Sequence, residues 1–66
     1  MRVTANGDAV DLADGATVDD LLARLGLGAK WVLVERNGEP LNRRDLATTV
    51  LVEGDRLELV RAVAGG

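Results

Sequence analysis

Apolar and polar side chains alternate at the start of the chain, as they do in a half-buried β-hairpin. Residues 2–5 form a short run that suits a strand, and residues 8–12 return as its partner, with Val10 and Leu12 alternating with Asp11. The pair between them, Asn6-Gly7, accepts positive φ at both positions and is the strongest short signal for a hairpin turn. The pattern therefore predicts two antiparallel strands, with Asp14-Gly15 ending the hairpin.

The spacing of apolar residues then changes from two to the three-and-four spacing of an amphipathic helix. Thr17 can cap the amino end of that helix, and two acidic residues follow in its first turn. Gly26 stands where a left-handed carboxyl-terminal cap belongs, and Leu27 can make the accompanying hydrophobic contact. The apolar stripe consists of Val18, Leu21, Leu22 and Leu25. A helix this short needs a sheet to pack against.

The run Trp31–Arg36 is rich in β-favouring residues and begins with four apolar side chains, which predicts a central strand. Trp31 is the only aromatic residue. Stacking on a ligand is one interpretation of it, but a tryptophan at the mouth of a strand more often caps the core. The strand ends at a second Asn-Gly turn, Asn37-Gly38, and Pro40 beyond it suits an edge or a loop.

The second half of the chain predicts a polar loop followed by another hairpin. Residues 42–47 are irregular, with a helical turn around residues 44–46. The β-branched run Thr48–Val52 and the strand Arg56–Val63 are expected to pair around the turn at residues 53–55.

Alternation along the last strand places Leu57 and Leu59 on one face and Glu58 and Val60 on the other. Val60 is therefore an apolar side chain on a polar face, and we expect it to be a candidate for docking a partner. The alternative is an ordinary exposed apolar residue without a role. The apolar residues that continue this strand are further candidates for partner contact: Ala62, Val63 and Ala64.

Two strands, one helix and further strands predict an α+β fold, with one main helix packed across a mixed sheet of four to five strands. This is the β-grasp arrangement. We expect residues 1–62 to form the domain and residues 63–66 to form a flexible tail.

Composition excludes several functions for this chain of 66 residues, which has no cysteine and no histidine. It offers no thiolate nucleophile, no disulfide, no histidine-based metal site and no ready base at neutral pH. The 11 Asp and Glu residues show no convergent pair, so we do not expect an autonomous enzyme.

A formal net charge of −3 argues against nucleic acid, because binding to phosphates needs clustered Lys and Arg. The adjacent pair Arg43-Arg44 is best explained as an exposed loop. No segment is long and apolar enough for a membrane span, and the start does not resemble a signal peptide. The expected compartment is therefore the cytoplasm.

The sequence closes on Gly65-Gly66. Without Cβ atoms, two glycines can enter a narrow slot in another enzyme, and we expect Gly66 to present a free carboxylate there. Gly65 would give the access, and Gly66 would be the reacting group. The alternative is a frayed end with no function.

In its motifs the whole chain resembles the ubiquitin-like sulfur carriers, and most closely the ThiS family of thiamine biosynthesis. The segments that carry the resemblance are Val3–Gly7, Thr17–Leu22, Asn37-Gly38-Glu39, Glu53–Val60 and Ala62–Gly66. The chain departs from the family at Leu46, near which relatives often have tryptophan, and at residues 41–44, where they often have Val-Pro.

The resemblance implies a sulfur carrier and not an enzyme. In the family, a ubiquitin-activating-like adenylyltransferase uses ATP and magnesium to adenylate the terminal glycine, which here is Gly66. Sulfur that originates from cysteine then displaces AMP and leaves a thiocarboxylate, which delivers its sulfur to thiazole synthase. The carrier itself binds no cofactor or metal. Lacking cysteine, it also lacks an internal thiol that could capture the activated acyl group.

Three other functions stay open at this stage. The small subunit of molybdopterin synthase shares the fold, the Gly-Gly end and the thiocarboxylate, although it is typically longer. A ubiquitin-like protein modifier would join Gly66 to a target lysine. A plain β-grasp interaction module would not use the tail.

Overall fold

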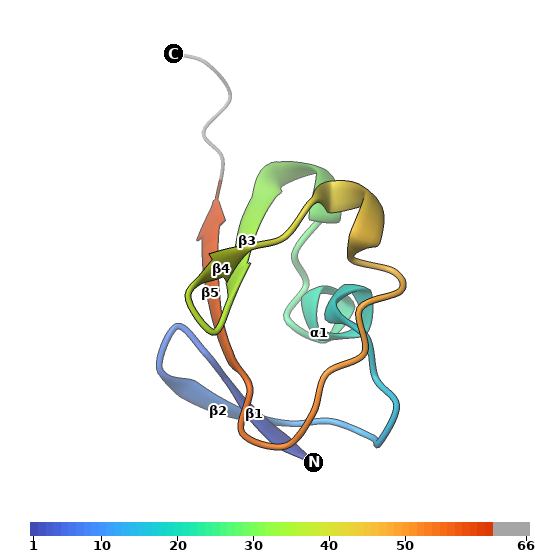
Figure 1. Cartoon of the computed structure of the whole chain (residues 1–66), viewed down its shortest axis with the longest axis vertical. Coiled ribbons are helices and arrows are strands. Elements are labelled where there is room, and N and C mark those ends of the chain that lie inside the picture. Colours follow the sequence, from blue (N-terminus) through green and yellow to red (C-terminus); the bar gives the residue numbers. More distant parts are fainter. Residues whose placement is uncertain (62–66) are drawn as a thin grey trace.

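The computed structural model describes residues 1–61, which form a single sheet with one α-helix on one side of it (Figure 1). Within these residues the five strands are β1 (Arg2–Ala5), β2 (Asp8–Asp11), β3 (Val32–Arg36), β4 (Glu39–Pro40) and β5 (Arg56–Arg61). The helices are α1 (Val18–Arg24) and two short 3₁₀ helices, η1 (Ala29–Trp31) and η2 (Arg43–Asp45). No helix in this part of the chain is long and apolar enough to cross a membrane.

The strands lie in the order β2-β1-β5-β3-β4, and β5 is the middle strand. It runs parallel to β1 and antiparallel to β3, so the sheet is mixed, as predicted. The run predicted as the central strand is β3, which is paired on both sides but starts at Val32 and lies second from an edge. Pro40 lies on the edge strand β4. An edge strand tolerates proline, because a residue that is paired on one side only does not need an N–H for a second neighbouring strand.

The predicted hairpin between residues 48–52 and the last strand is wrong. The segment instead meets the chain just before α1, where Thr17 and Val50 form an isolated bridge. The amide of Leu51 donates to the carbonyl of Ala16 at 2.9 Å, and the amide of Val18 donates to the carbonyl of Thr49 at 3.0 Å. Because these backbone groups bond here, the β-branched run does not join the sheet.

Both ends of α1 are capped as the sequence predicts. The Thr17 side chain and Asp20 form a reciprocal capping box at the amino end. At the other end Gly26 has φ of 72°, and the amides of Gly26 and Leu27 donate to two carbonyls of the last turn, a Schellman motif. Leu25 is 39% exposed, because the helix ends at Arg24 and the predicted stripe stops one residue short.

The core lies between α1 and one face of the sheet. Its buried side chains come from β1, α1, β3, β5 and the segment between η2 and β5: Val3, Ala5, Val18, Leu21, Leu22, Val32, Val34, Leu46, Leu51, Leu57 and Leu59. Trp31 is not among them, because η1 directs it outward and leaves it 50% exposed. Its predicted role as a cap on the core is therefore wrong. Among residues 1–61 no helix covers the opposite face of the sheet, and the side chains of that face form the surface described next.

Candidate functional site

The outer face of β5 carries the docking candidate that the sequence predicts. Leu57 and Leu59 are buried against the helix side, whereas Glu58 and Val60 point outward, so the predicted alternation is confirmed. Val60 is 56% exposed. The remaining predicted site residues, Ala62, Val63, Ala64, Gly65 and Gly66, lie outside the described residues, and so does the predicted boundary between domain and tail. Those assignments stay predictions.

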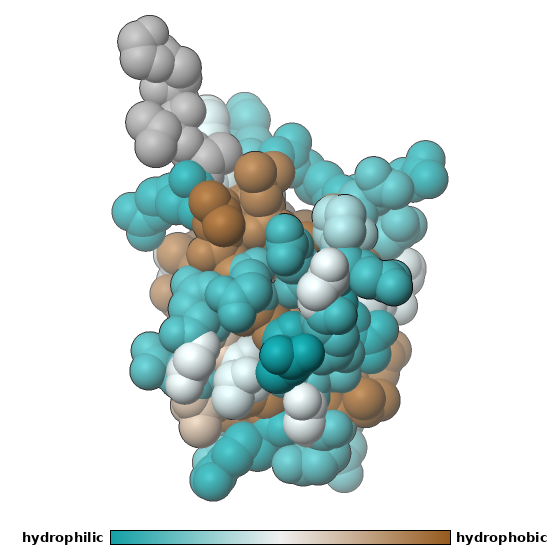
Figure 2. All heavy atoms as spheres, turned by 60° about the vertical axis from the view of Figure 1, so that its left-hand side comes forward, coloured by the Kyte–Doolittle hydropathy of each residue, from teal (hydrophilic) through white to brown (hydrophobic). Residues whose placement is uncertain are grey.

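Val60 has an apolar neighbour that the sequence analysis missed. The register of β3 and β5 places Leu33 directly opposite Val60, and Leu33 is 59% exposed. We call these two residues the outer-face apolar pair. Figure 2 shows apolar surface gathered at this end of the sheet, next to the place where β5 ends. The signal was present in the sequence, because alternation along Val32–Arg36 turns Leu33 outward when Val32 and Val34 are buried.

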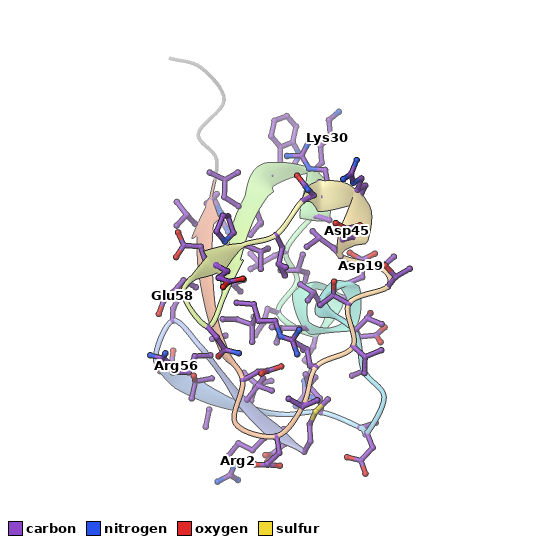
Figure 3. The ribbon with its side chains drawn as sticks, viewed as in Figure 1. Arg2, Asp19, Lys30, Asp45, Arg56 and Glu58 are labelled. Atoms are coloured by element: carbon purple, nitrogen blue, oxygen red, sulfur yellow. The ribbon has the colours of Figure 1, made fainter. Side chains whose placement is uncertain are left out.

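Trp31 lies at the same end of the sheet. Its neighbour Val32 pairs with Arg61, the last described residue of β5, so the backbone of Trp31 is close to where the described chain ends. The Lys30 ammonium lies 5.2 Å from the centre of the indole ring, within the range of a cation–π contact. Figure 3 shows Lys30 at this end of the molecule. The exposed indole lies on η1, two residues before Leu33 in sequence.

Two residues along each strand from the apolar pair, two carboxylates face each other across the strands. Glu35 and Glu58 are register partners, and both are exposed. Like charges in this relation destabilise a sheet, because the Cβ atoms of such partners are only about 5 Å apart. None of the ion pairs or side-chain hydrogen bonds formed within residues 1–61 involves either carboxylate. The outer face therefore combines an apolar pair with an uncompensated acidic pair.

The side chain of Asn6 holds β5 in place beyond the end of β1. Its amide nitrogen donates to the carbonyl of Leu59 at 3.0 Å, and its amide oxygen accepts from the Leu59 N–H at 2.8 Å. The side chain thus satisfies both backbone groups of Leu59, as a strand residue would. The residue before Val60 is fixed by these two bonds.

A second asparagine, Asn37, and the buried Asp55 anchor the start of β5. Asn37 accepts a hydrogen bond from the Arg56 N–H at 2.9 Å and donates to Asp55 at 3.0 Å. Asp55 also accepts from the Val52 N–H at 2.9 Å and forms an ion pair with Arg36 at 2.9 Å. The carboxylate is 4% exposed and fully bonded.

Burial disfavours the charged form of Asp55 and would by itself raise its pKa. Hydrogen bonds from Val52, Asn37 and Arg36, together with the charge of Arg36, outweigh burial, and the pKa of Asp55 lies below its usual value. A carboxylate of this kind is ionised at neutral pH and bonded on every side. Its bonds to Val52, Asn37 and Arg36 hold the start of β5 in place.

The acidic side chains of residues 1–61 do not gather into a metal site. These residues contain no group of three or more His, Cys, Asp or Glu side chains that could hold a metal ion. The hydrogen bond and charge of Arg2 lower the pKa of Asp11, which is exposed on the β1–β2 hairpin. A shallow hollow at the β3–β4 turn is lined by Arg36, Asn37, Glu39 and Leu41, of which the first two are already bonded to Asp55.

Comparison with known families matches residues 2–66, almost the whole chain, to the ThiS family. The chain belongs to the ThiS family. The sulfur carrier protein ThiS of Bacillus subtilis is 40% identical over 53 residues, which cover 80% of this chain and 80% of that protein. The resemblance predicted from the sequence is thereby confirmed.

Two solved structures of a ThiS-family relative have the same fold. The crystal structure of the thiamine biosynthesis protein ThiS from Geobacter metallireducens has a TM-score of 0.83 and 35% identity, with full coverage of both chains. The solution structure of a thiamine biosynthesis protein from the same organism has a TM-score of 0.79, 38% identity and coverage of 100% of this chain and 88% of that one. These likenesses confirm the predicted β-grasp fold.

Larger proteins also contain a similar segment. The thiazole synthase of Paramagnetospirillum magneticum is 35% identical over 66 residues, which are all of this chain and 20% of that protein. The thiazole synthase of Magnetococcus marinus matches with the same identity and coverage. This ThiS-family chain thus spans about a fifth of the length of these two relatives.

Proposed function

We propose that this ThiS-family chain carries sulfur for thiamine biosynthesis as a thiocarboxylate on Gly66. The observation that carries the proposal is the family match, which runs through residues 2–66 and so includes Gly65-Gly66. The absence of Cys and His from the sequence agrees with it, because a carrier that holds sulfur on its own carboxyl group needs neither. In this account the chain is a co-substrate, and partner enzymes do the chemistry.

The chemistry begins with activation of the Gly66 carboxylate, which is a poor acyl electrophile. A partner adenylyltransferase, using ATP and magnesium, joins the carboxylate to AMP with release of pyrophosphate. The mixed anhydride has a good leaving group. A sulfur nucleophile derived from cysteine then attacks the carbonyl carbon, AMP departs, and the thiocarboxylate remains. Gly65 and Gly66, having no side chains, are suited to enter a narrow active-site slot.

The outer-face apolar pair is the part of the described structure that supports docking. Val60 and Leu33 lie at the end of β5 from which the sequence continues to Ala62, Val63 and Ala64. A partner that covers the pair and the exposed Trp31 would receive the residues after Arg61 at the rim of its binding surface. Burying apolar surface of this kind stabilises a complex by about 25 cal/mol per Å². The residues that follow Arg61 are proposed as additional contacts.

Thiazole synthase is the proposed acceptor of the sulfur. The support is that two proteins named thiazole synthase include a segment 35% identical to this whole chain. Carrier and acceptor would then work in one reaction sequence. The relatives named above are thiamine proteins, which favours this pathway over molybdopterin synthesis.

A genetic replacement tests the proposal in the organism that encodes the chain. Removing the coding sequence should make growth depend on added thiamine, and restoring the wild-type sequence should remove that dependence. A variant without Gly66 should fail to restore growth although it folds normally, because the reacting group is missing. Full restoration by this variant would contradict sulfur carriage through Gly66. Higher-mass conjugates that vanish with Gly66 would indicate a protein modifier instead.

A further inference from the structure

The facing carboxylates of Glu35 and Glu58 form no ion pair or side-chain hydrogen bond within residues 1–61. They are register partners in the antiparallel β3–β5 ladder, and both side chains are exposed. The ion pairs of residues 1–61 all lie elsewhere, at Met1–Asp14, Arg2–Asp11, Arg36–Asp55 and Arg44–Asp45. Arg56 is on the same face of β5, two residues from Glu58, yet it forms none of these pairs (Figure 3). The free protein thus keeps a repulsive pair in the middle of its open sheet face.

The position of the pair links it to the proposed docking surface. Glu35 and Glu58 are two residues from Leu33 and Val60 along their strands and point to the same side of the sheet. A partner that covers the apolar pair therefore also approaches the carboxylates. Because the Cβ atoms of such register partners are about 5 Å apart, one guanidinium can donate to both carboxylates, and one lysine ammonium can also contact both.

We infer that Glu35 and Glu58 together form a receptor for a basic side chain of thiazole synthase, beside the apolar contact at Leu33 and Val60. This inference rests on the proposed function. In the complex, the cation replaces the repulsion between the two carboxylates with attraction to both. The pair thus costs stability in the free carrier and favours the complex, which makes it a determinant of partner choice.

Charge complementarity selects a basic partner over a second copy of this chain. A two-fold pairing of this face around the acidic pair would bring the same two carboxylates of each copy toward one another. With a formal net charge of −3, the copies also repel each other as whole molecules. A partner surface that presents Arg or Lys within an apolar contact avoids both the repulsion between carboxylates and the repulsion between two acidic molecules.

Two measurements on the same variants test the inference. Glu58→Gln and Glu35→Gln each remove the repulsion while keeping the shape of the side chain. We expect each to raise Tm by about 1–5 °C and to weaken binding to thiazole synthase by about tenfold, measured by calorimetry at low salt. Glu58→Lys should raise Tm as well, by creating a cross-strand ion pair, and should abolish binding. A gain in stability joined to a loss of affinity is not expected from a residue with a purely structural role.

Glu39→Gln is the matched control. Glu39 is an exposed glutamate on β4 that forms no ion pair within residues 1–61, and its replacement changes the net charge by the same amount. It should leave Tm and affinity nearly unchanged. Equal effects of Glu39→Gln and Glu58→Gln, or unchanged affinity in both acidic-pair variants, would overturn the inference.

The outcomes also separate this inference from the proposed function. If the wild-type chain binds thiazole synthase and the acidic-pair variants bind equally well, only the inference fails. If the wild-type chain does not bind at all, the proposed acceptor fails with it. Self-association that Val60→Ser abolishes would assign the open face to a second copy and would also overturn the inference.

Discussion

At the scale of single residues, the asparagines of the two Asn-Gly turns each have two functions. Asn6 and Asn37 both have φ of 51°, which the turns require. Their side chains also bond to β5, Asn6 at Leu59 and Asn37 at Arg56. Both residues are therefore needed for the position of the middle strand.

Replacing Asn6 by glycine separates these two functions, because glycine accepts the positive φ but has no side chain. The variant should lose about 1–3 kcal/mol of unfolding free energy, since both backbone groups of Leu59 lose their partner. Urea denaturation measures the loss. Asn42→Gly serves as the comparison, because Asn42 makes no side-chain cap hydrogen bond. An Asn6→Gly variant no less stable than Asn42→Gly would show that the two bonds contribute nothing.

The lowered pKa of Asp55 predicts how the unfolding free energy changes with pH. Its pKa is lower in the folded protein than the usual value of 3.8, so the unfolded chain binds the proton first as pH falls. The contribution of the ionised carboxylate is therefore complete above the unfolded pKa and is lost as pH falls through the folded pKa. Unfolding free energies from denaturant titrations between about pH 7 and pH 3 should fall accordingly.

Asp55→Asn should be less stable at neutral pH by about 2–4 kcal/mol, because Arg36 loses its ionic partner. Its stability should also depend less on pH than that of the wild type. Asp8→Asn, which changes an exposed carboxylate on β2, is the control and should keep the wild-type dependence. A pH profile of Asp55→Asn parallel to the wild type would contradict this role.

At the scale of elements, turns and caps were predictable, whereas sheet order was not. The Asn-Gly turns, the Thr17 cap and the Gly26 cap depend on neighbours in sequence, so local chemistry was sufficient to place them. The middle position of β5 depends on pairing with β1, more than 50 residues away in sequence. The run at residues 48–52 has strand-like composition, but its backbone bonds to the segment before α1. Such choices depend on tertiary competition that composition does not contain.

The same reasoning explains which part of the candidate site was predictable. Val60 followed from alternation along one strand. Leu33 and the Glu35–Glu58 pair needed the register between two strands, which the structure supplies. Trp31 was misplaced because a 3₁₀ helix, η1, precedes β3 and turns the indole outward.

Val60→Ser tests the role of the β5 outer face. Since Val60 is 56% exposed, the change should alter the unfolding free energy by no more than about 0.5 kcal/mol. Affinity for thiazole synthase should fall by about tenfold, because the apolar contact is lost. Titration calorimetry measures the affinity.

Val52→Ser is the matched control, because Val52 is 54% exposed and lies outside the sheet. It should leave binding unchanged. Equal effects of the two substitutions on affinity would contradict a docking role for the outer face.

At the scale of the whole molecule, the two faces of the sheet differ: one is covered by the core, and the other is open. One face holds α1 and the core. The other carries the apolar pair near the end of β5 and the acidic pair two residues farther from that end. The middle strand, held by Asn6, Asn37 and Asp55, leads in sequence to the residues proposed to carry sulfur. In the proposed function, this domain presents the Gly66 carboxylate to partner enzymes.

The most direct test of sulfur carriage is the intact mass of the protein after incubation with its adenylyltransferase, ATP, magnesium and a cysteine-derived sulfur source. The account predicts an increase equal to the mass difference between sulfur and oxygen, confined to the fragment that contains Gly66. The variant without Gly66 should show no such increase. An unchanged wild-type mass, under conditions in which Bacillus subtilis ThiS is loaded by its own enzyme, would contradict the central claim.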